Sequence, residues 1–222
     1  MVRAKKSLGQ HFLNSQSTVA GIIKAAELKK EETVLEIGPG KGILTAALLE
    51  SGVRVLAVEK DREMVGFLQK RFADEINSGR LKLLNEDILE FDFPGRGLTS
   101  GNYKLVANIP YYITGEILRK FIGGETKPSL AVLLLQKEVA QRIATRGKPL
   151  DSARGKESIL SVSVKIYGEP EYVMKVPAGS FTPPPKVDSA VMAIKNLRND
   201  FSSAQAEKKF FKAVKTGFAH KR

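Results

Sequence analysis

The segment Asn108-Ile-Pro-Tyr111 places an amide, a proline and an aromatic ring directly after an apolar run. The exocyclic amine of a nucleobase is a poor nucleophile, because its lone pair is delocalised into the ring. Two acceptors would take hydrogen bonds from its two N–H groups and favour a tetrahedral nitrogen. They are the side-chain oxygen of Asn108 and a backbone carbonyl of the turn 108–110. Pro110 fixes the turn, and Tyr111 offers a flat face to an unstacked base. The spacing therefore predicts catalysis at a base amine without a strong general base.

A second aromatic residue, Phe181, stands before the proline run Thr182-Pro-Pro-Pro185, and its ring would close the other face of the base. Stacking on an aromatic ring stabilises a bound base by roughly 1–3 kcal/mol. A structural interpretation exists for both aromatic positions. Tyr111 would then be a core residue behind an Asn-Pro turn, and Phe181 would be a core residue beside a rigid loop.

A glycine-rich segment, Glu36-Ile-Gly-Pro-Gly-Lys-Gly42, lies where an apolar run meets a helical pattern. Its glycines permit a sharp turn and a close approach of the backbone to a ligand. The spacing fits neither the G-x-G-x-x-G pattern of dinucleotide-binding proteins nor the G-x-x-x-x-G-K-[ST] pattern of P-loops. Glu59 and Asp87 end the next two apolar runs, where carboxylates can reach ribose hydroxyls and an adenine amino group.

These carboxylates suit a ligand that carries an adenosine and a sulfonium cation, and they do not suit a pyrophosphate. The glycine turn resembles motif I of the S-adenosylmethionine (SAM) methyltransferases. We therefore expect SAM as the cofactor and S-adenosylhomocysteine as its product. The expected contacts come from the turn and the strand ends: Glu36, Gly38, Gly40, Gly42, Glu59, Asp87, Ile88 and Asn108. A structural glycine turn with surface carboxylates is the alternative.

Short apolar runs alternate with segments of helical periodicity over the first 145 residues. The runs are apolar throughout, which predicts strands with both faces covered by helices: 33–38, 54–59, 81–87, 103–109 and 130–136. This alternation predicts an α/β fold of Rossmann-like type, with a mostly parallel, doubly wound sheet. Two further strands are expected at 171–177 and 186–194, and a basic amphipathic helix near the end of the chain.

The composition excludes several classes of protein. The 222 residues contain no Cys and only two His, which argues against a disulfide scaffold, a thiolate nucleophile and a metal centre. No apolar run reaches membrane length, and the first residues lack the apolar core of a signal peptide. We therefore expect no membrane partner and a cytoplasmic location.

The net charge of +12 is unevenly distributed. Residues 31–100 contain nine Lys or Arg and thirteen Asp or Glu, whereas residues 101–222 contain 21 and ten. Basic flanks around an acidic centre indicate a polyanionic partner such as a nucleic acid. Phosphate contacts are expected from basic residues of the N-terminal arm and around the loop 146–157: Lys5, Lys6, Arg142, Arg146, Lys148, Arg154 and Lys156. A solvated basic face is the alternative.

Six segments together resemble the small-subunit rRNA adenine dimethyltransferases, the KsgA family. They follow the order of that family: Lys6-Ser-Leu-Gly-Gln-His-Phe-Leu13, Glu36-Ile-Gly-Pro-Gly-Lys-Gly42, Asn85-Glu-Asp87, Asn108-Ile-Pro-Tyr111, Gln136-Lys-Glu-Val139 and Phe181-Thr-Pro-Pro-Pro-Lys-Val-Asp188. The resemblance implies transfer of two methyl groups from SAM to N6 of each of two adjacent adenosines near the 3′ end of small-subunit rRNA. It further implies that His11 and Leu13 line the SAM site, and that Asn108, Tyr111 and Phe181 address the adenine.

The resemblance also leads to expectations about domains and partners. Residues 1–198 would form the catalytic domain with its basic arm 1–14, and residues 199–222 would begin a helical domain that is truncated here. Exposed apolar side chains on the last helix, Phe210, Phe211 and Val214, would fit such a truncation. The expected partner is the pre-small ribosomal subunit, and the expected state is a monomer.

Two alternative functions stay open. One is a large-subunit rRNA adenine N6-methyltransferase of the macrolide-resistance type. The other is a SAM-binding ribosome-assembly factor without catalysis, against which the intact turn 108–111 argues. The segments 6–13 and 181–188 favour the small-subunit branch.

Overall fold

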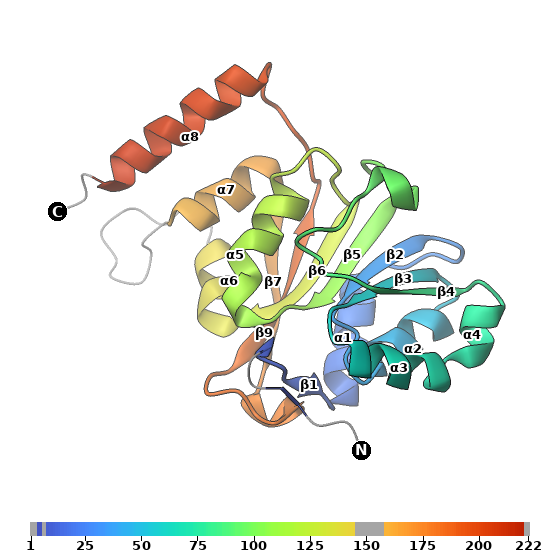
Figure 1. Cartoon of the computed structure of the whole chain (residues 1–222). Coiled ribbons are helices and arrows are strands. Elements are labelled where there is room, and N and C mark those ends of the chain that lie inside the picture. The colour runs from blue at the N-terminus through green and yellow to red at the C-terminus, as the bar shows by residue number, and fades with distance from the viewer. Residues whose placement is uncertain (1–3, 6–7, 145–157, 220–222) are drawn as a thin grey trace.

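A seven-stranded sheet forms the centre of the computed structural model, which describes residues 4–5, 8–144 and 158–219. The strand order is β4-β3-β2-β5-β6-β9-β7. The five strands from β4 to β6 are parallel, and β9 runs antiparallel to both β6 and β7. The strands span β2 (Thr33–Ile37), β3 (Arg54–Glu59), β4 (Leu81–Asn85), β5 (Tyr103–Asn108), β6 (Leu130–Gln136), β7 (Glu169–Val176) and β9 (Ser189–Lys195). The predicted doubly wound α/β sheet is confirmed (Figure 1).

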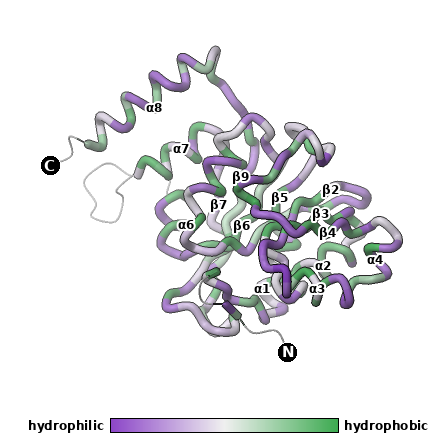
Figure 2. Tube along the Cα trace, in the orientation of Figure 1, coloured by the Kyte–Doolittle hydropathy of each residue, from purple (hydrophilic) through white to green (hydrophobic). Residues whose placement is uncertain are grey.

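Helices cover both faces of this sheet because successive strand residues point to opposite sides. In β2, Val34 packs into the core with the helices α1 (Gln16–Ala25), α2 (Ile43–Glu50) and α3 (Arg62–Arg71). Leu35 packs into the other core, with the helices α5 (Thr114–Ile117), α6 (Lys137–Ala144) and α7 (Ile159–Tyr167). Figure 2 shows the resulting apolar colouring along the central strands.

Short elements complete the chain between these layers. They are β1 (Phe12–Leu13), α4 (Ala73–Asn77), β8 (Phe181–Thr182), the 3₁₀ turns Pro94–Arg96, Tyr111–Ile113 and Ala178–Ser180, and a π-helical turn at Leu118–Ile122. β1 pairs antiparallel with β8, so the N-terminal arm lies beside the proline-rich loop. This pairing places segments that are far apart in the sequence side by side.

Among the described residues, helix α7 is the one long element that the sequence does not predict. Its residues Ile159–Tyr167 are rich in β-branched side chains, which favour strands. The helix begins with a capping box in which the Ser158 and Ser161 side chains bond each other's backbone N–H groups. Val164 and Tyr167 then bury one face against the sheet, so tertiary packing overrides the local preference.

Helix α8 (Ala204–Ala219) extends away from the sheet, and none of its residues is buried (Figure 1). The expectation that Phe211 is exposed is wrong, because its ring packs 6.0 Å from that of Tyr167 and is only partly exposed. Phe210 and Val214 are likewise partly buried. Glu207 accepts a hydrogen bond from the Tyr167 hydroxyl, so the first turns of α8 are tied to α7. A domain boundary at residue 198 stays a prediction.

Within the described residues, no helix combines the length and the apolar character needed to cross a bilayer.

The glycine turn gives a stability prediction at Gly42, whose φ of +78° lies in the left-handed region. A Cβ at this position would lie 2.5 Å from the Phe72 ring. We expect Gly42→Ala to lower the free energy of unfolding by about 2–4 kcal/mol, because it adds a left-handed Ala and an overpacked contact. Denaturant unfolding followed by circular dichroism measures this change.

The matched control is Gly66→Ala in α3, where no atom lies within 4 Å of the added Cβ. Since Ala is the better helix former by about 1 kcal/mol, this variant should be equally or more stable than the parent chain. Equal stability of the two variants would contradict the packing role of Gly42.

Candidate functional site

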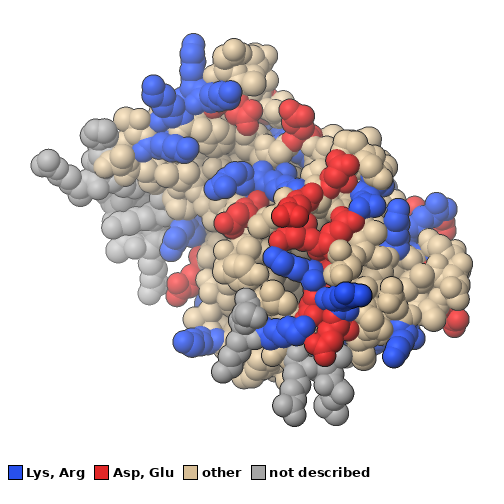
Figure 3. Space-filling view, viewed as in Figure 1, with Lys and Arg blue, Asp and Glu red and all other residues tan. Residues whose placement is uncertain are grey.

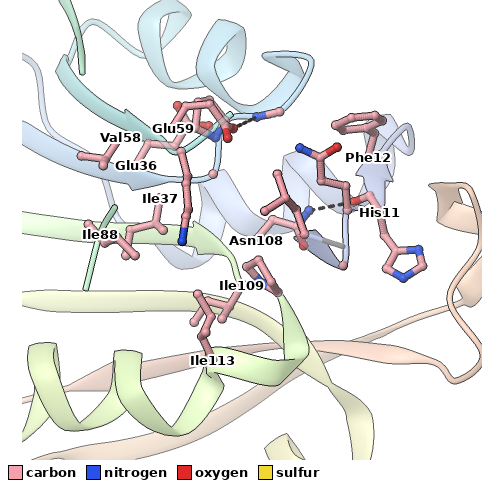
Figure 4. A pocket seen from close by; sticks show the side chains of 18 of the residues that line it. His11, Phe12, Glu36, Ile37, Val58, Glu59, Ile88, Asn108, Ile109 and Ile113 are labelled. Atoms are coloured by element: carbon pink, nitrogen blue, oxygen red, sulfur yellow. Dashed lines mark hydrogen bonds between the residues drawn. The ribbon is translucent and has the colours of Figure 1, made fainter. Parts of the chain in front are cut away.

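A cavity opens at the carboxyl ends of β2, β3, β4 and β5, where the loops after these strands meet the N-terminal arm. Most predicted site residues of the described chain line it: His11, Leu13, Glu36, Gly38, Gly40, Glu59, Asp87, Ile88, Asn108, Pro110, Tyr111 and Phe181. Figure 4 shows the two glutamates at one end and Asn108 with His11 at the other. The apolar part of the lining includes Ile37, Ile88, Ile109 and Ile113, which lie to the left of and below Asn108 in Figure 4.

The glycine turn brings backbone close to the cavity. Gly38 and Gly40 have φ values of +66° and +55°, and the Gly38 N–H donates to the Val58 carbonyl at 3.0 Å. A Cβ on Gly40 would lie 3.0 Å from the Phe12 ring of the arm, so the missing side chain lets the arm close over the turn.

Gly42 is the predicted cofactor residue that does not line the cavity. The position of a Cβ there is occupied by Phe72 and Leu68, and its N–H donates to the Pro39 carbonyl at 2.9 Å. The missing side chain of Gly42 lets the turn pack against α3, and a direct contact of Gly42 with the cofactor stays a prediction.

Glu36 is a buried carboxyl group with an unmet hydrogen-bonding need. The side chain is 1% exposed, and its Oε2 accepts a hydrogen bond from the Thr45 hydroxyl at 2.7 Å. No described residue donates to Oε1. Burial raises the pKa of Glu36 to about 8, which the bond from Thr45 opposes and the nearby Glu59 reinforces. A ligand that brings an N–H group or a positive charge would satisfy this oxygen.

Glu59, at the end of β3, is also buried but its two oxygens have partners. Oε1 accepts from the Asp61 N–H at 2.9 Å, and Oε2 accepts from the Gly40 N–H at 3.4 Å. Burial raises the pKa of Glu59, although these N–H groups favour the charged form. Each oxygen keeps a further lone pair, which is the capacity needed to accept ligand hydroxyls.

Asp87 follows β4 and is held in place from two sides. Its Oδ2 pairs with the Lys60 ammonium at 2.7 Å, and its Oδ1 accepts from the Leu89 N–H at 3.0 Å. The hydrogen bond with Lys60 lowers the pKa of Asp87. Asp87 thus stays charged at the rim of the cavity, next to the apolar side chain of Ile88.

The Asn108 side chain is oriented by the N-terminal arm. Its Nδ2 donates to the backbone carbonyl of His11 at 3.2 Å (Figure 4). A carbonyl can only accept, so this contact assigns the NH₂ end of the amide to His11. Oδ1 is consequently the acceptor that Asn108 presents at the other end of its amide.

Tyr111 is half-buried and fixed through its hydroxyl, which lies 2.6 Å from the Ser189 Oγ at the start of β9. Burial raises the pKa of Tyr111, so the phenol stays neutral at ordinary pH. The His11 ring lies nearly parallel to it, with ring centroids 6.1 Å apart. The His11 Nδ1 lies 2.7 Å from the Pro183 carbonyl, which requires a proton on Nδ1.

Phe181 lines the cavity but is only 3% exposed, and it packs in the core with Leu13 and Val176. A face-to-face sandwich of the base between Tyr111 and Phe181 needs an open face on both rings. The expected stacking of the base on the whole Phe181 ring does not fit this burial. Phe181 can contact a base only through the small part of its ring that reaches the cavity.

Two of the predicted phosphate-binding residues are described by the structure. The Lys5 ammonium lies 2.7 Å from Asp61 and 3.0 Å from Glu63, so it is neutralised by two carboxylates and holds the arm to α3. Arg142 is exposed on α6. The other predicted phosphate contacts lie outside the described residues: Lys6, Arg146, Lys148, Arg154 and Lys156.

Lys120 supports the cavity but is missed by the sequence analysis. Its Nζ donates to the carbonyls of Leu89 and Phe91, at 2.7 and 2.8 Å, and so fixes the loop that carries Asp87 and Ile88. Burial lowers the pKa of Lys120. A lysine among helical residues looks like a solvated charge in the sequence, and only the fold shows that it binds a distant loop.

The ribosomal RNA adenine dimethylase family model matches residues 1–222. The chain belongs to this family. It is 40% identical to the ribosomal RNA small subunit methyltransferase A of Dehalococcoides mccartyi (strain ATCC BAA-2266 / KCTC 15142 / 195), over 100% of this chain and 72% of that protein.

Two solved structures are similar to this member of the family. A dimethyladenosine transferase from Plasmodium falciparum superposes with a TM-score of 0.79 at 29% identity, over 96% of this chain and 72% of that one. The 23S rRNA methyltransferase ErmE superposes with a TM-score of 0.74 at 30% identity, over 93% and 79%. The fold is thus that of RNA adenine methyltransferases of the SAM-dependent class.

The buried Glu36 predicts a pH dependence of stability. Its pKa is about 8 in the folded chain against an ordinary value of 4.5, so the folded state holds a proton that the unfolded state has lost between these values. The stabilisation is therefore present at the acid end of this window and is lost as the pH rises towards 8. We expect the free energy of unfolding of the ligand-free chain to fall by roughly 2–4 kcal/mol between pH 5 and pH 8.

Urea titrations of the parent chain and of Glu36→Gln across this range measure the effect. Glu36→Gln should remove most of the slope, whereas the control Glu50→Gln, at an exposed position of α2, should leave it unchanged. An unaltered slope in Glu36→Gln would assign the dependence to other groups.

The contacts of Lys120 predict a selective effect on cofactor binding. Lys120→Met keeps the stem but removes two charge-assisted hydrogen bonds to the loop 89–91, so we expect the KM for SAM to rise about tenfold with little change in kcat. The neighbouring exposed Arg119 provides the control Arg119→Met, which should have no effect. An unchanged KM for SAM in Lys120→Met would show that the loop holds its position without Lys120.

Proposed function

We propose that this chain transfers methyl groups from SAM to N6 of two adjacent adenosines near the 3′ end of small-subunit rRNA, during assembly of the subunit in the cytoplasm. The observation that carries the proposal is the single cavity that contains both the buried carboxylates and the Asn108 turn. Membership of the adenine dimethylase family and the name of the Dehalococcoides relative support the substrate.

The polar and apolar groups that line the cavity fit SAM. Glu36 offers a buried oxygen that no described residue satisfies, which suits the positive charge and N–H groups of the methionine part. Glu59 suits the ribose hydroxyls, and the apolar Ile88 beside Asp87 suits the adenine. When bound, SAM supplies a methyl group on a positively charged sulfur.

The Asn108 turn is proposed to hold the amine of the target adenine. Oδ1 of Asn108 would accept one N–H, because Nδ2 is engaged by His11. Two carbonyls of the turn have other neighbours. The Pro110 carbonyl accepts from the Ile113 N–H at 3.1 Å, and the Asn108 carbonyl faces Gly38. We assign the second N–H to the Ile109 carbonyl. The amine then loses its proton only as it gains the methyl group, so no strong base is required.

We propose that the surface of this chain that binds rRNA is basic. Lys and Arg gather in the upper part of the view of Figure 3, where α8 lies, while acidic side chains form a band across its middle. Helix α8 carries Lys208, Lys209, Lys212 and Lys215, and we infer that residues 199–222 contribute to rRNA binding as the start of a second helical domain. We expect the active unit to be a monomer.

The similarity to ErmE makes large-subunit rRNA the alternative substrate, and one assay distinguishes the two. Tritiated SAM is supplied with small subunits that lack the modification or with large-subunit rRNA, and the labelled nucleoside is identified by mass analysis. We expect N6,N6-dimethyladenosine from the small subunit, at positions that primer extension maps to adjacent adenosines. Labelling of large-subunit rRNA alone would overturn the proposal.

The role of Asn108 gives a catalytic prediction. Asn108→Ala removes the acceptor for the target amine, so we expect methyl transfer to fall by at least about 10²–10³-fold while SAM binding stays nearly intact. Single-turnover transfer and equilibrium SAM binding measure the two quantities.

The control for Asn108 is Asn102→Ala. The Asn102 amide serves a remote turn through bonds with the Thr99 N–H and the Gly97 carbonyl, and its loss should leave transfer unchanged. Transfer at the parental rate by Asn108→Ala would show that another group holds the amine.

A further inference from the structure

Tyr112 is a large aromatic side chain left in solvent at the cavity. In the described part of the chain, four large hydrophobic side chains are exposed, namely those of Phe67, Tyr112, Ile159 and Val187. Tyr112 is the most exposed of them, at 59%, and it alone among the four lines the cavity. A single exposed ring is ordinary on a protein surface, and the informative feature of Tyr112 is its place at the cavity, where a bound ligand could stack on it.

The turn Tyr111–Ile113 directs its two tyrosines to different surroundings. Tyr111 is half-buried, with its hydroxyl fixed to Ser189 inside the domain. Tyr112 reaches the arm instead, where a Cβ on Gly9 would lie 3.3 Å from its Cδ1 and Cε1 atoms. The catalytic turn therefore presents one ring to the interior of the site and the next ring to solvent at its mouth.

The arm supports the Tyr112 ring along one side and leaves the rest open. Gly9 has a φ of +57°, which favours glycine, and the missing side chain allows the close approach. The Phe181 ring, by contrast, lies in the cavity wall and is only 3% exposed. More than half of Tyr112 instead faces outward, towards whatever binds over the mouth.

We propose that Tyr112 is a second nucleobase subsite, whose ring stacks on the base next to the adenosine held in the cavity. This inference rests on the proposed function, because it requires an RNA strand over the Asn108 turn. Extrusion of one base leaves its neighbour without a stacking partner, and an aromatic face replaces that partner. The ligand is thus an unstacked base of single-stranded RNA, and an adjacent adenosine fits it.

The test compares Tyr112→Ala, Tyr112→Leu and Tyr112→Phe in steady-state methylation of small subunits that lack the modification. We expect the KM for the subunit to rise about tenfold in Tyr112→Ala and nearly as much in Tyr112→Leu, because an aliphatic side chain cannot stack. Tyr112→Phe, which keeps the ring, should retain the parental KM. The KM for SAM should be unchanged in all three variants.

Phe67→Ala is the matched control, because Phe67 is an exposed aromatic residue on α3 away from the cavity. It should leave both KM values unchanged. A parental KM for the subunit in Tyr112→Ala, or a rise in the KM for SAM instead, would overturn the subsite. A parental KM for the subunit in Tyr112→Leu would show that an apolar contact is sufficient, and it would overturn stacking.

The parental chain in the same assay separates this inference from the proposed function. If it methylates the small subunit while Tyr112→Ala is unaffected, the function stands and the subsite fails. If it methylates large-subunit rRNA alone, the proposed function fails, and the same series on that RNA decides the subsite. If it methylates neither RNA, the subsite is rejected together with the function on which it rests.

Discussion

The hydrogen bond from the Asn108 side chain to the His11 carbonyl couples the end of β5 to the N-terminal arm. An amide has one donor end and one acceptor end, so this bond leaves Oδ1 as the end that Asn108 can offer to a ligand. The position of His11 in turn depends on the pairing of β1 with β8, in which Phe12 lies opposite Thr182 and Leu13 opposite Phe181. The orientation of one amide is therefore set by two segments, β1 and β8, that are far apart in the sequence.

The acidic and basic residues of this chain are concentrated in different segments. The acidic stretch 31–100 supplies Glu36, Glu59 and Asp87 to the cavity, where burial raises the pKa of the two glutamates. Such groups are costly in an empty site and become favourable when a cationic ligand arrives. The basic excess lies in the segments that flank this stretch in the sequence, and the proposed contacts with RNA phosphates would come from those segments.

Strand ends and turns could be predicted from the sequence because they depend on local chemistry. The apolar runs define the strands, and in a parallel sheet their carboxyl ends share one edge, so Glu59 and Asn108 are expected at the same edge of the sheet. Lys120 and Ser189 could not be found in this way, since their roles consist of single contacts between segments distant in the chain. Gly42 carried the same local signal as Gly38, and only the position of Phe72 distinguishes them.

Asp61 shows how closely the arm and the cofactor site are linked. Its side chain caps α3 through the Glu63 N–H, and the same carboxylate accepts from Lys5 and Gln10 of the arm. Burial would raise the pKa of Asp61, but the bonds from Lys5 and Gln10 outweigh it and keep the carboxylate charged. Its backbone N–H meanwhile donates to Glu59. A displacement of the arm would thus remove the bonds of Lys5 and Gln10 to Asp61, the residue whose own backbone N–H holds Glu59 in place, so the arm supports the wall of the cavity.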